Sequence, residues 1–172
     1  MTLFLIGYMG SGKTIVGKKL AEILNYDFID FDDYISQKEQ ASISDIFKVK
    51  GEIYFRKAEY KYLRDVLGLK TTVVSLGGGT PCYGNNMQTL LNTDNVNSIY
   101  LKASIPTLTK RLYDERSHRP LIAHIDSKDA LSEFIGKHLF ERAPFYEQAH
   151  KRIDTNDKDV TEIVEEILLN LY

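Results

Sequence analysis

The chain has 172 residues, of which 43% are hydrophobic and 27% are charged, as expected of one soluble globular domain. Its net charge of -2 argues against the strongly basic surface that nucleic acids and anionic membranes select. The single cysteine, Cys82, excludes an internal disulfide and fits a reducing compartment. The sequence shows no secretory leader pattern and no apolar run of bilayer-spanning length. We therefore expect a cytoplasmic protein without nucleic-acid or membrane partners.

Strands and helices are predicted to alternate along the chain. Apolar runs predict strands over Leu3–Ile6, Asp27–Phe31, Thr72–Leu76, Ser98–Lys102 and His150–Asp154. Helical periodicity predicts helices over Lys13–Leu24, Asp33–Lys38, Ser44–Lys50, Ile53–Leu67, Asn85–Leu91, Ile105–Tyr113, Lys128–Phe145 and Val160–Leu171. This alternation predicts one α/β domain over residues 1–172, with a central parallel sheet in a three-layer α/β/α arrangement. Ligands of such sheets bind beyond the carboxyl ends of the strands.

A phosphate-binding loop (P-loop) is predicted directly after the first strand. Residues Gly7–Thr14 read G-Y-M-G-S-G-K-T and match G-x-x-x-x-G-K-[ST] at every fixed position. The loop joins a strand to the start of a helix, whose backbone N–H groups and dipole favour phosphate there. Lys13 can reach the β- and γ-phosphates, and Thr14 can offer a hydroxyl to Mg²⁺. The sequence therefore predicts a P-loop nucleotide-binding protein.

Acidic residues follow the second predicted strand. Because side chains alternate along a strand, Asp30 and Asp32 are expected on one face and Phe31 on the other. One carboxylate can hold Mg²⁺ or its waters, and the other can accept a hydrogen bond from a substrate hydroxyl. Asp33 is interpreted as the N-cap of the following helix.

Arginines provide candidates for recognising an acidic substrate. Arg56 and Glu59 are three residues apart in a helix, so they can pair and fix a guanidinium fork for a carboxylate, or form an ordinary surface ion pair. Arg142 lies near a helix C-terminus, where it can also serve the helix dipole. The polar stretch 114–125 is interpreted as a mobile lid that brings an arginine onto phosphate, or as a solvated loop.

Further motifs connect these residues to a known family. After the P-loop come Asp30-x-Asp32, Ile46-Phe47…Gly51-Glu52…Phe55-Arg56…Glu59, Leu76-Gly77-Gly78-Gly79, Arg119-Pro120-Leu121 and Arg142-x-Pro-x-Tyr146-x-x-Ala149. Nearly from end to end, this series resembles the shikimate kinase family of P-loop small-molecule kinases. The resemblance implies a nucleoside-monophosphate-kinase-like fold with an acceptor-binding helical segment at about 33–60 and a mobile lid at about 114–125.

The resemblance implies roles on the nucleotide side. Lys13 would stabilise the transferring phosphoryl group, Thr14 and Asp30 would hold Mg²⁺, and Arg119 would come down from the lid onto the phosphates. One arginine would lie against adenine; Arg111 is the first candidate and Arg116 competes with it. The implied ATP-binding residues are Gly10, Ser11, Gly12, Lys13, Thr14, Ile15, Arg111, Arg119 and Asn156, the last at the edge of the base.

On the acceptor side, the resemblance implies transfer of phosphate from ATP to shikimate, giving shikimate 3-phosphate and ADP. Asp32 would hydrogen-bond the acceptor hydroxyl, and Lys13, Asp32 and Arg119 would be the catalytic residues. A loose transition state needs little early proton removal, so we expect Asp32 to position the hydroxyl first and to act as a base second. The implied shikimate site comprises Asp32, Phe47, Phe55, Arg56, Glu59, Gly77, Gly78, Gly79 and Arg142.

Other functions fit the residues less well. A kinase for another small hydroxylated acid or for a nucleotide, gluconate kinase being the obvious example, would share the P-loop, but the paired arginines and the triple glycine argue against it. A GTPase switch needs N-K-x-D, and residues 156–159 read N-D-K-D. A nucleotide-binding protein without chemistry does not explain Lys13, Asp30, Asp32 and Arg119.

Cys82 is interpreted as a packing residue, with the weaker hypothesis that its alkylation blocks shikimate binding. The default oligomeric state is a monomer.

Overall fold

The computed structural model describes residues 1–171; Tyr172, the last residue of the predicted domain, lies outside the described residues. Its centre is a parallel sheet of five strands in the order β2-β3-β1-β4-β5. The strands are β1 (Thr2–Ile6), β2 (Asp27–Asp30), β3 (Thr72–Ser75), β4 (Val96–Lys102) and β5 (Lys151–Asp154). The predicted parallel α/β sheet is confirmed.

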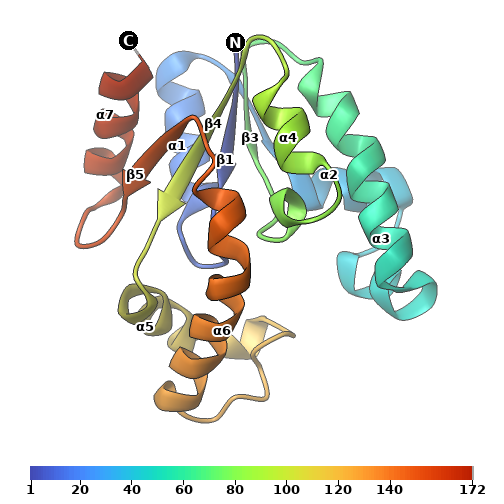
Figure 1. Ribbon diagram of the computed structural model, residues 1–172, viewed down its shortest axis with the longest axis vertical. Coiled ribbons are helices and arrows are strands. Elements are labelled where there is room, and N and C mark those ends of the chain that lie inside the picture. The colour runs from blue at the N-terminus through green and yellow to red at the C-terminus, as the bar shows by residue number, and fades with distance from the viewer. Residues whose placement is uncertain (172) are drawn as a thin grey trace.

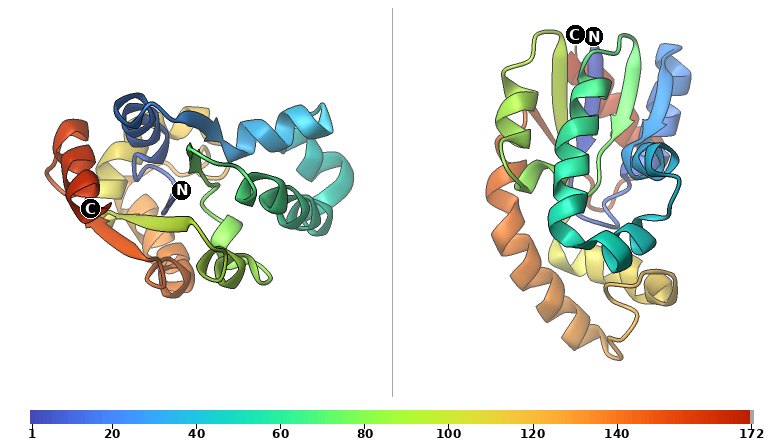
Figure 2. Two further views of the ribbon diagram at one scale, coloured as in Figure 1. Left: turned by 90° about the horizontal axis from the view of Figure 1, so that it is seen from above. Right: turned by 90° about the vertical axis from the view of Figure 1, so that its right-hand side faces the viewer.

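Helices cover both faces of the sheet (Figure 1, Figure 2). Leu3 and Leu5 of β1 face a core shared with α1 and α7, whereas Phe4 and Ile6 face a core shared with α3, α4 and α6. This alternation follows from the two-residue period of a strand buried on both sides. The helices are α1 (Lys13–Leu24), α2 (Phe31–Glu39), α3 (Ile43–Leu67), α4 (Asn86–Leu91), α5 (Ile105–Glu115), α6 (Lys128–Tyr146) and α7 (Val160–Leu171), with 3₁₀ turns η1 (Thr80–Cys82) and η2 (Arg116–His118).

The end of β2 differs from the prediction. The strand stops at Asp30, whose carboxylate accepts hydrogen bonds from the backbone N–H groups of Asp32 (3.1 Å) and Asp33 (3.3 Å). Asp30 is therefore the N-cap of α2, and the assignment of that role to Asp33 was wrong. The expectation that Asp30 and Asp32 lie on one face of a single strand was also wrong, because Asp32 lies in the first helical turn. Capping satisfies two donors that a helix start leaves unpaired.

Helix α3 spans both helices predicted between Ser44 and Leu67. It is broken at Gly51, which has φ 84° and ψ 171°, so the predicted interruption is present as a kink inside one element. A positive φ of this kind is accessible to glycine at little cost. In the predicted lid stretch 114–125, Ile122 and Ile125 are buried, so part of this segment is anchored to the core. Within residues 1–171, no helix combines the length and apolar character needed to cross a membrane.

Candidate active site

The P-loop wraps the N-terminus of α1 at the carboxyl end of β1. A Cβ at Gly7 would lie 2.8 Å from the carbonyl oxygen of Leu101, so the loop cannot accept a side chain there without shifting the backbone. Lys13 donates to the carbonyl oxygens of Gly7 (2.8 Å) and Tyr8 (3.0 Å), which holds its ammonium group inside the loop. Burial lowers the pKa of Lys13 to about 8, partly offset by the nearby Asp32 carboxylate.

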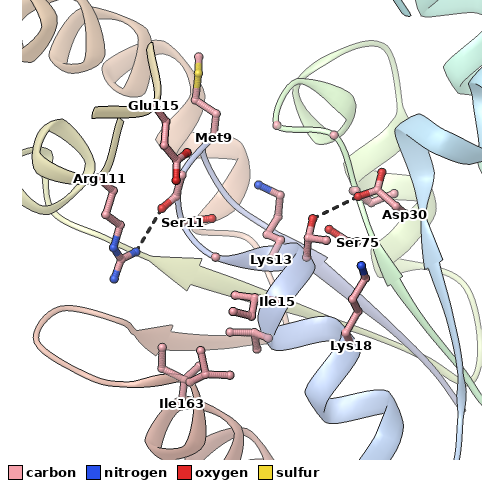
Figure 3. Close-up of a pocket in the computed structure, with 18 of the residues that line it drawn as sticks. Met9, Ser11, Lys13, Ile15, Lys18, Asp30, Ser75, Arg111, Glu115 and Ile163 are labelled. Carbon is pink, nitrogen blue, oxygen red and sulfur yellow. Dashed lines mark hydrogen bonds between the residues drawn. The ribbon is translucent and has the colours of Figure 1, made fainter. Parts of the chain in front are cut away.

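A cavity of about 890 Å³ opens in front of this loop (Figure 3). The P-loop forms one wall, and the ends of β2 and β3 form another. The lining residues are Met9–Val16, Lys18, Asp30, Asp32, Ser75–Gly78, Arg111, Glu115, Arg119, Lys158–Val160 and Ile163. The structure thus brings together side chains from segments more than 100 residues apart, including every predicted catalytic residue.

The residues predicted to hold a divalent cation are adjacent at one edge of the cavity. The hydroxyl of Thr14 donates to Oδ2 of Asp30 at 3.1 Å, while Oδ1 of Asp30 caps α2. A hydroxyl and a carboxylate oxygen beside a phosphate loop are the hard ligands that Mg²⁺ takes, usually with few protein groups besides substrate phosphates and water. The donor set therefore fits Mg²⁺.

Asp32 is the second acid of the cavity. Burial is the main cause that raises the pKa of its carboxyl group to about 6, with further contributions from Asp30 and Glu59, and Lys13 opposes the shift. A Cβ at Gly77 would lie 2.7 Å from Oδ1 of Asp32, so this carboxylate rests directly against residues Gly77–Gly79, which we call the glycine turn. A carboxylate with a pKa near neutrality is suited to accept a proton or a hydrogen bond from a substrate hydroxyl.

Arg56 and Glu59 pair with Glu59 buried and the Arg56 side chain 18% exposed, so this is not an ordinary surface ion pair. Glu59 is 1% exposed, and its Oε2 accepts from Nη1 of Arg56 at 2.7 Å. Its other oxygen, Oε1, accepts from the hydroxyl of Thr80 at 2.6 Å. Both carboxylate oxygens are thus occupied, which holds the Arg56 guanidinium in one orientation. Sequence analysis missed Thr80, because this contact joins residues 21 positions apart.

Arg142 of α6 approaches the same glycine turn. A Cβ at Gly79 would lie 2.9 Å from Nη1 of Arg56 and 3.3 Å from Nη2 of Arg142. We call Arg56 and Arg142 the arginine clamp. Two guanidinium groups meeting beside a turn without side chains provide paired donors for a small carboxylate. The turn is itself held by Tyr146, whose hydroxyl donates to the carbonyl oxygen of Gly78 at 2.5 Å.

The two predicted aromatic residues lie beside the arginine clamp. The rings of Phe47 and Phe55 are 4.6 Å apart between centroids, and Phe55 lies 5.3 Å from the guanidinium carbon of Arg56. Phe55 is buried, whereas Phe47 is 36% exposed. Phe47 therefore presents an open ring face next to a site for an anion.

Arg111 and Arg116, the two candidates for contact with adenine, lie in different environments. Arg111 lines the cavity and donates to the carbonyl oxygens of Gly10 (3.2 Å) and Thr155 (3.3 Å). Arg116 instead stacks on Tyr113, with its guanidinium carbon 4.0 Å from the ring centroid, and is not among the lining residues.

Asn156 is placed differently from the prediction. It does not line the cavity, and its Oδ1 accepts from the backbone N–H of Ser104 at 2.9 Å, which ties the turn after β5 to the start of α5. Val160 and Ile163 do line the cavity and form an apolar wall with Ile15. Sequence analysis missed the first two, because helical periodicity predicted only core packing for them.

Arg119 reaches the cavity from the segment after η2. Its Nη2 donates to Oε2 of Glu115 at 3.0 Å, and its Nε is buried without a partner among the described residues.

Cys82 lies behind the glycine turn, where burial raises the pKa of its thiol to about 11. A thiol of this kind is weakly nucleophilic, in agreement with the packing interpretation.

The strand order and the loop between β1 and α1 define the chain as a P-loop kinase with a nucleoside-monophosphate-kinase-like fold. The family model described as shikimate kinase matches residues 9–172. The chain belongs to the shikimate kinase family.

Individual relatives agree with this assignment. A shikimate kinase of Flavobacterium johnsoniae is 42% identical over 167 residues, which cover 96% of each protein. A crystal structure of shikimate kinase from Bacteroides thetaiotaomicron superposes with a TM-score of 0.91 at 34% identity, covering 99% of this chain and 98% of that one. The shikimate kinase of Acinetobacter baumannii in complex with shikimate gives a TM-score of 0.84 at 32% identity, covering 99% and 92%.

Proposed function

We propose that the protein transfers the γ-phosphoryl group of ATP to the 3-hydroxyl of shikimate, giving shikimate 3-phosphate and ADP. The observation that carries the proposal is the turn Gly77–Gly79 that Asp32 and the arginine clamp share: Asp32 lies against Gly77, which lines the P-loop cavity, and Arg56 and Arg142 lie against Gly79. A site for a hydroxyl and a site for a carboxylate are thus two residues apart on one turn. Shikimate carries both groups on one small ring. The relative from Acinetobacter baumannii, whose structure contains shikimate, supports the same acceptor here.

The nucleotide side of the cavity supplies positive charge. Phosphoryl transfer passes through a loose transition state with negative charge on the equatorial oxygens, so catalysis depends mainly on alignment and charge neutralisation. Lys13, the P-loop N–H groups and Arg119 provide that field. Thr14 and Asp30 would hold Mg²⁺, which would neutralise phosphate charge. Arg111 covers one face of the adenine, and Ile15, Val160 and Ile163 provide the apolar wall.

The acceptor side orients the nucleophile. The clamp binds the shikimate carboxylate, Phe47 and Phe55 contact the ring, and Asp32 accepts the hydrogen bond of the 3-hydroxyl. As the oxygen–phosphorus bond forms and the β–γ bridging bond breaks, the hydroxyl proton passes to Asp32 or to solvent. The raised pKa of Asp32, about 6, supports the proton-accepting role because it brings the carboxylate closer to the pKa range of an effective base.

Release of ADP from Mg-ATP tests the proposal with a panel of acceptors: shikimate, quinate, gluconate, a nucleoside monophosphate and water. We expect turnover with shikimate alone, abolished in Lys13→Ala. Turnover with gluconate instead would keep the P-loop kinase and overturn the assignment of the clamp. Release of ADP with water at the same rate as with shikimate would refute acceptor phosphorylation.

A further inference from the structure

A cluster of polar side chains joins α2 to α3 outside the cavity. Glu39, the last residue of α2, accepts from the hydroxyl of Tyr62 through Oε1 at 2.7 Å. Its Oε2 accepts from the hydroxyl of Tyr54 at 2.7 Å and from the ammonium group of Lys50 at 3.1 Å. We call these four residues the Glu39 cluster. One carboxylate thus receives three hydrogen bonds from a single long helical element.

The carboxylate at the centre of the cluster is ionised and largely shielded. The side chain of Glu39 is 9% exposed. Hydrogen bonds from Tyr62 and then Tyr54 lower the pKa of Glu39 to about 2, and the same contact raises the pKa of Tyr62 to about 12. The Glu39 anion and the neutral hydroxyl of Tyr62 therefore persist across the whole pH range in which a kinase works. Hydrogen bonds to an ionised acceptor are the stronger kind.

The three donors lie on both sides of a break in α3. Gly51 has φ 84° and ψ 171°, and no atom lies within 4 Å of the place that a Cβ would occupy. The side of Gly51 on which a side chain would stand therefore makes no contact that could set the angle at the break. Lys50 directly precedes it, and Tyr54 and Tyr62 follow it. Glu39 is bonded to both halves at once.

The half of α3 before Gly51 is weakly anchored by apolar contacts. Between residues 43 and 50, Ile46 is the only buried residue, and Val49 is exposed. A helical segment with few buried contacts opens locally at low free energy. Of the Glu39 cluster, Lys50 lies in this half, and its 3.1 Å contact with Glu39 adds a polar link to the apolar contacts of Ile43, Ile46 and Phe47.

We propose that Glu39 is a positioning residue that fixes the angle between the two halves of α3 and thereby the separation of Phe47 and Phe55. Phe47 lies on the half before Gly51 and Phe55 on the half after it, with ring centroids 4.6 Å apart. Rotation about the break would move one ring relative to the other. The inference rests on the proposed function, in which these two rings contact the acceptor.

The same helix that ends in Glu39 begins beside the reacting groups. Asp32 lies in the first turn of α2 and Glu39 seven residues later, roughly 10 Å along the axis. The Glu39 cluster therefore links the half of α3 before Gly51 to the helix that carries Asp32. Loss of the cluster should weaken binding of the acceptor and leave the phosphate side unchanged.

Glu39→Gln tests this, because glutamine keeps the shape but removes the charge and one acceptor oxygen. In the ligand-free protein, we expect hydrogen exchange of amides 43–50 to accelerate about tenfold, with β1 and α1 unchanged. We expect the KM for shikimate to rise about five- to tenfold, while kcat and the KM for ATP stay within about twofold. This division separates positioning of the acceptor from general destabilisation.

Single-donor variants and a control complete the test. Tyr54→Phe and Lys50→Met should each give a smaller effect that is not additive with Glu39→Gln, because all act through one carboxylate. Glu133→Gln on α6 removes an exposed ion pair with Lys137 (2.9 Å) and should change nothing.

Several results would overturn the inference. They are unchanged exchange of residues 43–50 in Glu39→Gln, acceleration spread evenly over the chain, or a fall in kcat at constant KM. If the wild-type protein does not phosphorylate shikimate, the proposed function fails, and the exchange measurement still decides whether Glu39 holds the break in α3.

Discussion

Replacement of Gly79 by alanine perturbs the arginine clamp with little effect on the fold. The added Cβ would lie 2.9 Å from Nη1 and 3.1 Å from Nη2 of Arg56, and 3.3 Å from Nη2 of Arg142. Gly79 has φ -86° and ψ -19°, a conformation that alanine adopts without strain. The obstructing atoms are the ends of flexible side chains, so the methyl group displaces the two guanidinium groups and leaves the backbone in place.

The expected magnitude follows from the hydrogen bonds at stake. A hydrogen bond to a charged group contributes about 1.5–3 kcal/mol. If the displaced clamp loses one such bond to the shikimate carboxylate, the KM for shikimate rises roughly 10- to 100-fold, because about 1.4 kcal/mol corresponds to a factor of ten. The free energy of unfolding should change by less than about 1 kcal/mol, since alanine at a compatible position restricts the unfolded chain.

Steady-state kinetics with varied shikimate at saturating ATP, together with thermal unfolding, measure both effects. Gly68→Ala is the matched control: Gly68 ends α3 with φ -78°, and its added Cβ would meet only the carbonyl oxygen of Asp65 at 3.8 Å. That variant should keep the wild-type KM. An unchanged KM in a stably folded Gly79→Ala protein would refute the clamp, and a lower kcat at constant KM would assign the turn to the chemical step instead.

Three further predictions concern the reacting groups. Because the pKa of Asp32 is about 6 and that of Lys13 about 8, kcat/KM should fall below about pH 6 as the carboxylate is protonated and above about pH 8 as the ammonium group loses its proton; a profile flat from pH 5 to pH 9 would contradict both assignments. Arg119→Ala should reduce kcat by on the order of 10³–10⁵, the range for arginines that neutralise a transferring phosphoryl group, and a single-turnover loss below about tenfold would remove it from that role. Asp32→Asn should raise the KM for shikimate; if kcat remains near normal in rapid-quench measurements, Asp32 positions the hydroxyl without acting as a base.

The phosphate side of the cavity could be predicted from sequence because it is built from contiguous residues. The eight positions Gly7–Thr14 include the whole loop, the ammonium group of Lys13 and the hydroxyl of Thr14. The strand before them and the helix after them are clearly indicated by their apolar residues. The predicted bounds of α1 agree with the structure at both ends, Lys13 and Leu24. Local chemistry and local conformation therefore indicate the same site.

The acidic pair shows where local reasoning failed. Strand alternation was extended to Asp32, but the carboxylate of Asp30 ends the strand by accepting two backbone hydrogen bonds. A capping carboxylate and a strand residue look alike in sequence, and burial of Phe31 and Ile35 against the core favours the helix. The two acids still meet at the cavity, although a different element carries each of them.

The acceptor side depends on contacts between distant segments. Burial distinguishes these contacts from ordinary exposed ion pairs. Arg56 and Glu59 at a three-residue spacing are compatible with an exposed ion pair, which contributes little to stability. The structure buries Glu59 and adds Thr80 as a second donor. Taking a charged pair out of water costs free energy that apolar packing would not, so such a pair is weak evidence for stability. Here the pair faces the turn Gly77–Gly79 and a second arginine, Arg142. In the proposed function, the pair presents a guanidinium group that is oriented before the acceptor arrives, which reduces the ordering required on binding.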